Sequence, residues 1–369
     1  MPNLPTMKKI RVPHTPADLT GMLPTPYNAS ENLHFSEAPP ASPHATHLQQ
    51  LLHPMLQAHP ELVALAKTAA GYFADQLAPS TRHLYAGDWQ RFADWCAAYG
   101  MTALPADVGT VALYITAIAK QERSLSTIKH HLAAIKAKHE DAGYPSSPAS
   151  PIIKRIIQGI SRQHGRPARS AQALLPETLR QVVQAIDETT LIGKRDKALL
   201  LLGFAGAFRR SELVGLNMED LQWYDAGVIV QLGHTKTDQH GQGRLVGIPR
   251  GAHPETCPVL ALETWLLAAH LDTGAIFRGM DGKDRLISPR LSGRAVSLII
   301  KRHLTAVGLD TTRYSGHSLR AGHCTAAVRA GVHAKLIMQQ SGHRSHGMML
   351  KYIRLGSIFS ENSANAINV

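Results

Sequence analysis

The chain has 369 residues and a net charge of +12, and 44% of its residues are hydrophobic, enough for substantial buried cores. It is longer than the size at which one core usually keeps growing, so two globular domains are expected. The three cysteines lie far apart without CxxC spacing, which argues against a disulfide framework or a zinc ribbon. Neither a signal-peptide pattern nor an apolar run of the ~20 residues that a bilayer requires is present, so a soluble, cytoplasmic protein is expected.

Residues 1–58 are rich in Pro, Ser, Thr, His and Asn and show no sustained apolar period. Such a composition buries too little apolar surface to offset the entropy of ordering, so we expect a variable, disordered tail.

A helical pattern runs through residues 59–163 and predicts a small helical domain. Its clearest helix follows Ser80, a candidate N-cap, and stops at Gly100. Apolar and aromatic residues recur there in steps of three and four and predict one buried stripe, made of Tyr85, Trp89, Phe92, Cys96 and Tyr99.

Three more helices are expected in this domain, over residues 108–119, 126–142 and 152–160. The second of them places Ile128, Leu132 and Ile135 inward and displays lysines elsewhere, which makes a cationic helix surface. Residues 164–173 are polar and broken by Gly and Pro, so they are expected to be a linker.

Residues 174–369 are expected to form a second, mainly helical domain with one β-hairpin. The expected hairpin strands are residues 228–232 and 244–249, and the polar, Gly-rich stretch GHTKTDQHGQG between them is expected to form a long mobile tip. Helices are expected at residues 257–270, 292–307, 316–330, 334–340 and 347–355.

The positive charge is concentrated in two segments. Residues 120–170 contain ten Lys or Arg against three Asp or Glu, and residues 301–369 contain nine against two, whereas the remainder is about neutral. Clustered cations gain from neutralising phosphates and releasing counterions, so two contacts with one nucleic acid are indicated. A basic but otherwise ordinary surface is the alternative, since a high pI alone is common.

The C-terminal region holds four residues with the chemistry of a phosphate site. In GHSLRAGH, His317 and Arg320 are three residues apart on a predicted helix and should project from the same face. His343 follows in a second GH pair, and Tyr352 comes nine residues later in LKYIR. Tyr352 taken alone would be interpreted as an aromatic core anchor.

Three further candidates lie upstream. FRRSEL places Arg209 three residues before Glu212, and the hairpin offers Lys236 in HTKT. Together with the C-terminal residues they make a nucleophile and a set of donors for charge on equatorial phosphate oxygens, which suits phosphoryl transfer. Arg210 is the alternative to Arg209, although the spacing to Glu212 favours Arg209. Lys236 could be a solvated hairpin lysine, and Glu212 could simply pair with a nearby arginine.

This ordered set resembles the tyrosine recombinase (phage integrase) family, and more narrowly the Cre-type recombinases. FRRSEL, GHTKT, SGHSLRAG and the nine-residue step to Tyr352 carry the resemblance, and TIKHHLAAIKAKHEDAGYP is similar to the family's core-binding domain. It implies a mainly α fold: an N-terminal SAM-like helical core-binding domain and a mostly helical catalytic domain with a small β-hairpin, forming a C-shaped DNA clamp.

The resemblance also implies the chemistry. Tyr352 attacks a DNA phosphodiester, forms a 3′-phosphotyrosine and releases a 5′-hydroxyl, while Arg209 and Arg320 clamp the nonbridging oxygens. His317 bonds the phosphate and assists proton transfer, and His343, where Cre-like relatives often carry tryptophan, donates to the phosphate.

Two supporting roles complete what the resemblance implies. Lys236 is the general acid for the 5′-oxygen, and Glu212 orients the site. Neither ATP nor a metal is expected, because the phosphotyrosine conserves the energy of the broken bond.

The implied partner is double-stranded DNA with an inverted-repeat site. The protein is expected to be a monomer or dimer off DNA and a homotetramer on two sites, exchanging strands through a Holliday junction, with accessory proteins left open. Arg294 is a candidate for a major-groove base contact. Phosphate contacts are expected from Lys129, Lys136, Arg302 and Arg313.

Other interpretations fit the sequence less well. The histidines and the cysteine between residues 317 and 346 could be taken for a metal cluster, but they spread over several predicted helices without a familiar ligand spacing. A DNA-binding accessory protein would be favoured only if the catalytic set were broken, and the set is intact. Relatives that form hairpin telomeres or relax supercoils use the same phosphotyrosine step, but the compact chain disfavours them.

Overall fold

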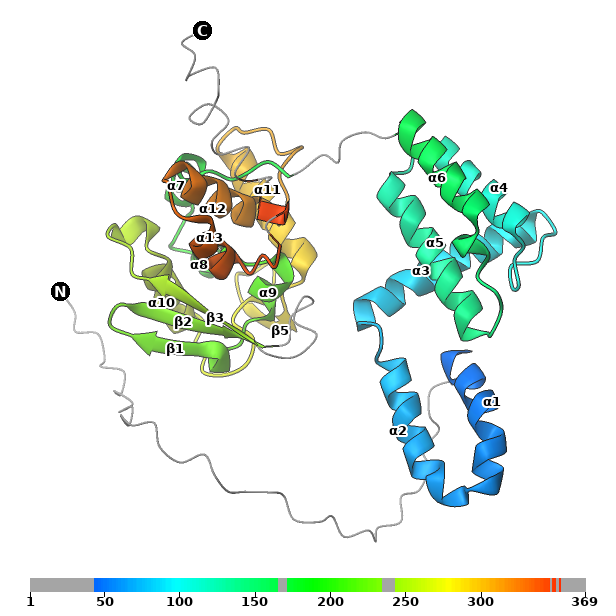
Figure 1. The fold of residues 1–369 in the computed structure, drawn as a ribbon. Coiled ribbons are helices and arrows are strands. Elements are labelled where there is room, and N and C mark those ends of the chain that lie inside the picture. Colours follow the sequence, from blue (N-terminus) through cyan, green and yellow to red (C-terminus); the bar gives the residue numbers. More distant parts are fainter. Residues whose placement is uncertain (1–42, 165–170, 234–242, 346, 350–351, 353–369) are drawn as a thin grey trace. The chain divides into compact units, whose positions relative to one another are not determined.

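The computed structural model describes residues 43–164, 171–233, 243–345, 347–349 and 352 (Figure 1). Two compact units meet in the sequence between His164 and Gly165, and each is described by itself. The predicted linker overlaps residues 165–170, which lie outside the described residues. No helix within the described ranges combines the length and the apolar character needed to span a membrane.

The first unit is a helical bundle, as the sequence predicts. Its core is formed by fully buried side chains of α3, α4, α5 and α6, with Phe92, Ile115 and Ile135 at its centre. α4 begins where the Asp107 carboxylate accepts the Thr110 N–H at 2.7 Å, and α5 begins where the Ser124 hydroxyl caps Thr127. The helices are α2 (Val63–Ala74), α3 (Pro79–Ala98), α4 (Val108–Lys120), α5 (Leu125–Asp141) and α6 (Pro151–His164), with short 3-10 turns at Pro60–Leu62 and Ser147–Ala149.

Part of the segment expected to be disordered is helical. α1 (Pro43–Ala58) packs against α2 and α5, so the predicted tail is wrong for residues 43–58. The reason lies in Leu52 and Leu56, four residues apart and partly buried, which give the helix one apolar side. Residues 1–42 lie outside the described residues.

The start of α3 also differs from the expectation. Pro79 occupies the first turn and Ala78 is the N-cap, so Ser80 lies inside the helix. Proline suits this position because its missing N–H would have no helical partner there. In the predicted stripe Phe92 and Cys96 are fully buried, whereas Tyr99 is 65% exposed and lies outside the core.

The second unit is built around α8, which is buried on all sides. Asp196 on this helix is fully buried and pairs with Arg195, Arg302 and His303. Burial raises the pKa of Asp196, but the His303 hydrogen bond and the two guanidiniums outweigh it and lower the pKa below its usual range. The helices are α7 (Pro176–Gln184), α8 (Leu191–Ala205), α9 (Arg210–Gly215), α10 (Pro258–Ala268), α11 (Gly293–Ala306), α12 (Ser318–Arg329) and α13 (Ala334–Ser341), with 3-10 turns at Met218–Asp220 and Pro254–Thr256.

The expected hairpin is present and belongs to a three-stranded antiparallel sheet. β2 (Gly227–Leu232) pairs with β3 (Arg244–Pro249) so that Leu232 faces Arg244, and β1 (Leu221–Tyr224) adds an edge that the sequence did not predict. A second two-stranded sheet, β4 (Arg278–Met280) with β5 (Leu286–Arg290), was also not predicted.

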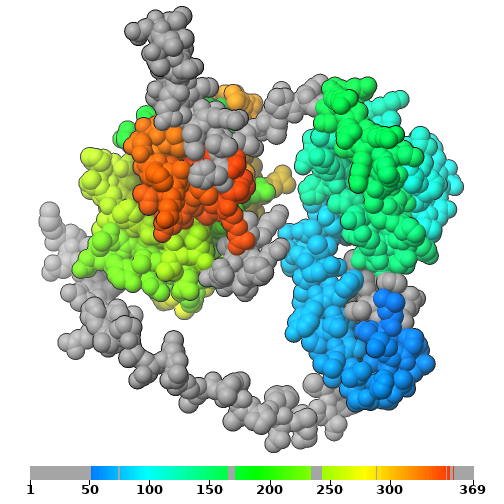
Figure 2. Space-filling model, in the orientation of Figure 1, coloured from blue at the N-terminus to red at the C-terminus, as the bar shows by residue number. Residues whose placement is uncertain are grey.

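Figure 2 shows orange residues from the region of α12 and α13 next to yellow-green residues from the region of the sheet on one face of this unit. The Gln340 side chain fixes α13 to the sheet by donating to the Gly247 carbonyl at 3.1 Å. The C-terminal end of α13 is therefore held next to the base of the hairpin. Residues 347–349 and Tyr352 are helical, as expected.

Candidate active site

Three arginines from distant parts of the sequence meet at the C-terminal end of α13. Arg244 at the start of β3 donates to the Gln340 carbonyl, Arg320 on α12 donates to the Ser341 carbonyl, and Arg209 before α9 donates to the Gly342 carbonyl at 3.0 Å. The last carbonyls of a helix have no helical partner and carry partial negative charge. The helix end therefore orders three guanidiniums side by side.

The carboxylate of Glu212 forms ion pairs with two of these arginines. Its side chain is only 3% exposed, and it pairs through Oε1 with Arg209 and through Oε2 with Arg244 at 3.3 Å. Oε2 also accepts the Arg209 backbone N–H at 2.8 Å, which satisfies a backbone donor at the start of α9. The predicted partnership of Arg209 and Glu212 is thus a direct contact, while Arg210 is exposed.

The cluster is electropositive, with three guanidiniums around one carboxylate. Arg320 is 2% exposed, and burial followed by the charge of Arg209 lowers its pKa. Burial likewise lowers the pKa of Arg244, and the charge of Glu212 acts in the opposite direction. Because a guanidinium stays protonated in proteins even when its pKa falls, the uncompensated charge favours binding of an anion.

His343 follows the arginine cluster directly and lies beside Tyr352. Their ring centroids are 5.4 Å apart, and His343 Nδ1 is 2.7 Å from the Ser341 hydroxyl. Partial burial lowers the pKa of His343 to about 4, and the charges of Arg320, Arg209 and Arg244 add to the effect. His343 is therefore neutral at neutral pH.

Tyr352 rests on a small apolar cluster of Cys324, Ile337 and Met349. Burial raises the pKa of its phenol and Cys324 adds to the rise, whereas the charges of Arg320 and Arg209 lower it. The two guanidiniums are thus close enough to Tyr352 to act on its ionisation.

His317 lies at the N-cap of α12, one turn before Arg320. The residue is exposed, but loss of solvent around its ring, followed by the charges of Arg320, Arg210 and Arg209, lowers its pKa. The positive charge of the arginine cluster therefore also lowers the pKa of His317. Lys236 lies outside the described residues, so its predicted place in the site stays a prediction.

The residues expected to contact DNA lie in both units. Lys129 and Lys136 are exposed on α5, where Lys136 lies 3.5 Å from Glu140. Arg294 is exposed in the first turn of α11, and Arg313 is exposed after that helix. Arg302, by contrast, pairs with the buried Asp196, so part of its charge is used within the protein.

Sequence reasoning missed Arg244 and Gly342. Gly342 is left-handed, with φ of 68°, and ends α13 in the usual glycine cap. A Cβ atom there would lie 2.9 Å from Arg244 Cζ, so an alanine at this position would displace the guanidinium. The glycine of SGH was a usable signal for a helix end, but only the fold brings Arg244 to it.

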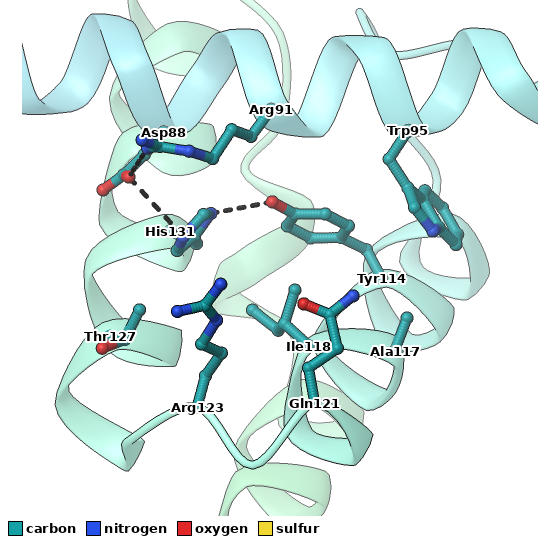
Figure 3. Close-up of a pocket in the computed structure, with 10 residues that line it drawn as sticks. All are labelled: Asp88, Arg91, Trp95, Tyr114, Ala117, Ile118, Gln121, Arg123, Thr127 and His131. Carbon is teal, nitrogen blue, oxygen red and sulfur yellow. Dashed lines mark hydrogen bonds and ion pairs between the residues drawn. The ribbon is translucent and has the colours of Figure 1, made fainter.

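The first unit contains a separate cavity of about 360 Å³ between α3, α4 and α5 (Figure 3). On its wall the buried His131 ring accepts or donates a 2.7 Å hydrogen bond with the Tyr114 hydroxyl and lies 3.5 Å from Asp88, which also pairs with Arg91. These contacts satisfy polar groups between packed helices, so a structural role explains them.

Comparison with known proteins adds the decisive observation. Residues 172–357, half of the chain and the whole of the site, match the phage integrase family. The chain belongs to this family, the tyrosine recombinases. It is therefore an enzyme, a site-specific recombinase that transfers DNA strands.

Relatives of this recombinase cover most of its length. A protein of Selenomonas ruminantium described as an integrase/recombinase XerD homolog is 40% identical over 291 residues, 78% of this chain and 85% of the relative. Tyrosine recombinase XerC of Oceanobacillus iheyensis is 23% identical over 72% of this chain and 83% of its own. These relatives are named as Xer recombinases, and the narrower resemblance to Cre-type enzymes stays a prediction.

Solved structures share the fold of this recombinase. The XerH site-specific recombinase bound to a palindromic difH substrate has a TM-score of 0.56 at 16% identity, covering 82% of this chain and 84% of that one. A lambda integrase dimer bound to a COC′ core site has a TM-score of 0.52 at 16% identity, covering 84% and 97%. Among the described residues of this recombinase, no group of three His, Cys, Asp or Glu side chains is placed to hold a metal ion.

Proposed function

We propose that this recombinase cleaves and rejoins duplex DNA through a 3′-phosphotyrosine intermediate on Tyr352. The observation that carries the proposal is that Arg209 and Arg320 converge on one helix end and that the charges of both act on the Tyr352 phenol. A phosphate held by these arginines would meet the phenol oxygen. Fixed donors aimed at the charge that develops on phosphorus are the main source of catalysis in such a site.

The transfer step exchanges one ester for another. The Tyr352 oxygen forms a bond to phosphorus, the bond to the 5′-oxygen breaks, the phenol loses its proton and the 5′-oxygen gains one. Because the raised pKa keeps the phenol protonated at rest, a base must receive that proton. His317 suits this role, since its lowered pKa leaves it neutral. Lys236 would protonate the leaving 5′-oxygen.

His343 would donate a hydrogen bond to the phosphate through Nε2. The Ser341 hydroxyl has one proton and contacts both His343 Nδ1 and the Ile337 carbonyl, at 2.7 and 2.6 Å. If the hydroxyl donates to Ile337, Nδ1 carries the ring proton and Nε2 donates only from the imidazolium. A bound phosphate would favour that form by raising the pKa of His343. Glu212 would hold Arg209 in place throughout.

The assembly belongs to the same proposal. The XerH and lambda integrase structures contain DNA substrate or core-site DNA, which supports double-stranded DNA with an inverted-repeat site as the partner here. Both units would contact one duplex, four protomers would pair two sites, and strands would exchange through a Holliday junction. The protein would be a monomer or dimer off DNA and would act in the cytoplasm, with or without accessory proteins.

A nicked duplex carrying the recombination site tests the cleavage step. The nick lets the 5′-terminated fragment diffuse away, so the covalent complex accumulates on a denaturing gel. We expect it with the wild type and not with Tyr352→Phe, while binding in a gel shift persists. Tyr224→Phe, which changes an exposed tyrosine on β1, is the matched control and should still form the complex. A covalent band in Tyr352→Phe would exclude Tyr352 as the nucleophile.

A further inference from the structure

We propose that Arg244 is a positioning residue for DNA cleavage, which keeps Arg209 available to the phosphate and fixes the turn that carries His343. This inference rests on the proposed function, because it assigns Arg244 a task in the same reaction. Arg244 is not part of the residue set that the family resemblance supplies, and it lies at the start of β3, 35 residues after Arg209 in the sequence.

Both terminal nitrogens of Arg244 are engaged within the protein. Nη1 donates to the Gln340 carbonyl and lies 3.4 Å from the Gln339 carbonyl, and Nη2 lies 3.3 Å from Glu212 Oε2. The side chain is 20% exposed. Through these contacts Arg244 can act on cleavage by holding Glu212 and the end of α13 in place.

The shared carboxylate makes Arg209 depend on Arg244. Glu212 is nearly inaccessible to solvent, so its negative charge must be balanced by neighbouring cations. With both arginines present, each carboxylate oxygen has its own guanidinium. If Arg244 were removed, Glu212 would have Arg209 as its remaining cation among these contacts and would hold that guanidinium more tightly. Arg209 would then be less able to turn toward a phosphate.

The same guanidinium shapes the turn before His343. It lies against Gly342, where a Cβ atom would meet its Cζ and Nε at 2.9 Å, and it ties the preceding carbonyls to β3. Arg209 donates to the Gly342 carbonyl from the other side. Loss of Arg244 would therefore release one of the contacts that set the direction of His343.

The test compares cleavage of two nicked duplexes by the full-length protein. One has an ordinary scissile phosphate, and the other has a methylphosphonate there, which removes the negative charge that Arg209 would bind. We expect Arg244→Ala to slow cleavage of the phosphate duplex about 10- to 100-fold, by analogy with the loss of groups that orient metal ligands. The loss on the methylphosphonate duplex should be several-fold smaller. Arg250→Ala, which removes an arginine just after β3 that pairs with Glu263, is the matched control and should cleave both duplexes like the wild type.

Two companion variants exclude a merely structural role. Arg209→Ala combined with Arg244→Ala should lose less rate than the product of the two single losses, because part of the effect of Arg244 acts through Arg209. Arg244→Lys, which keeps the charge but loses the planar fork, should fold normally and restore only part of the rate.

Three results would overturn the inference: wild-type rates in Arg244→Ala and Arg244→Lys, equal losses on both duplexes, or losses that multiply in the double variant. Failure of the proposed function is distinguishable, since the wild type itself would then form no covalent complex that depends on Tyr352.

Discussion

At the scale of single residues, the arginine cluster changes the ionisation of the histidines beside it. His343 is held neutral by partial burial and by three guanidiniums, with a pKa of about 4 against an ordinary value of 6.5. The unfolded chain therefore binds a proton at this residue more readily than the folded protein between these two values. The contribution of His343 to the free energy of unfolding is therefore fully present above about pH 6.5 and is lost as the pH decreases toward 4.

This linkage predicts a specific difference between the wild type and His343→Gln. Lowering the pH from about 7 to about 5 should destabilise the wild type by about 1 to 2 kcal/mol more than the variant, because glutamine does not titrate. Urea unfolding at the two pH values measures the difference. His317 and His323, whose pKa values are also lowered, are present in both proteins and cancel. Equal pH dependence in the two proteins would show that the cluster does not act on His343.

Arg209 could be identified from the sequence, whereas Arg244 could not. The three-residue step to Glu212 favours Arg209 over Arg210, and that step is a direct ion pair in the structure. Arg244 gives no such signal, because its partners lie 32 and 96 residues away along the chain. Local spacing reveals contacts within one helical turn, whereas contacts between β3 and α13 depend on the complete fold.

At the scale of secondary-structure elements, the end of α13 organises the site. Four successive residues there, 339–342, offer carbonyls to three arginines, and the left-handed Gly342 then redirects the chain to His343. The end of α13 thus brings three separate arginine side chains into one cationic cluster.

The variant Gly342→Ala tests whether cleavage depends on the absence of a side chain at position 342. A left-handed alanine costs roughly 1–2 kcal/mol of stability, and its Cβ would also press on the Arg244 guanidinium. Gly331→Ala is the matched control, because Gly331 is equally left-handed but has no atom within 4 Å of the place that an alanine methyl would take. Both variants should unfold at lower urea concentration, but only Gly342→Ala should also slow cleavage, by about 10-fold or more. Equal cleavage rates in the two variants would show that Arg244 tolerates displacement.

The secondary structure was predictable where the local pattern was strong. Both hairpin strands and most helices follow from apolar spacing and glycine stops, and the observed bounds of β3 equal the predicted ones. β1 and the β4–β5 pair were missed, because strands of three to five residues are too short to show a period. α1 was missed because Pro54 and a polar background obscure its two partly buried leucines.

At the scale of the whole molecule, the two basic segments of the sequence fall mainly in different units, one in α5 and α6 and the other from α11 onward. Not all of that charge is available to DNA. Arg302 offsets the buried Asp196, and Arg320 is buried at the end of α13. The exposed cations Lys129 and Arg313 are therefore better placed for phosphate contacts.

Phosphate contacts in both units predict a steep salt dependence of DNA binding. Each neutralised phosphate contributes about −0.9 to the slope of log K against log salt concentration, so a slope of about −5 or steeper is expected for the full-length protein. Lys129→Gln and Arg313→Gln should each make the slope less steep by about 0.9, and their combination by about twice that, because the two residues lie in separate units and act independently. A fluorescence-anisotropy titration over a range of salt concentrations measures all four proteins. If one substitution leaves the slope unchanged, that unit does not contact phosphate through the substituted residue, and a nearly flat slope in the wild type would contradict DNA contact by both basic segments.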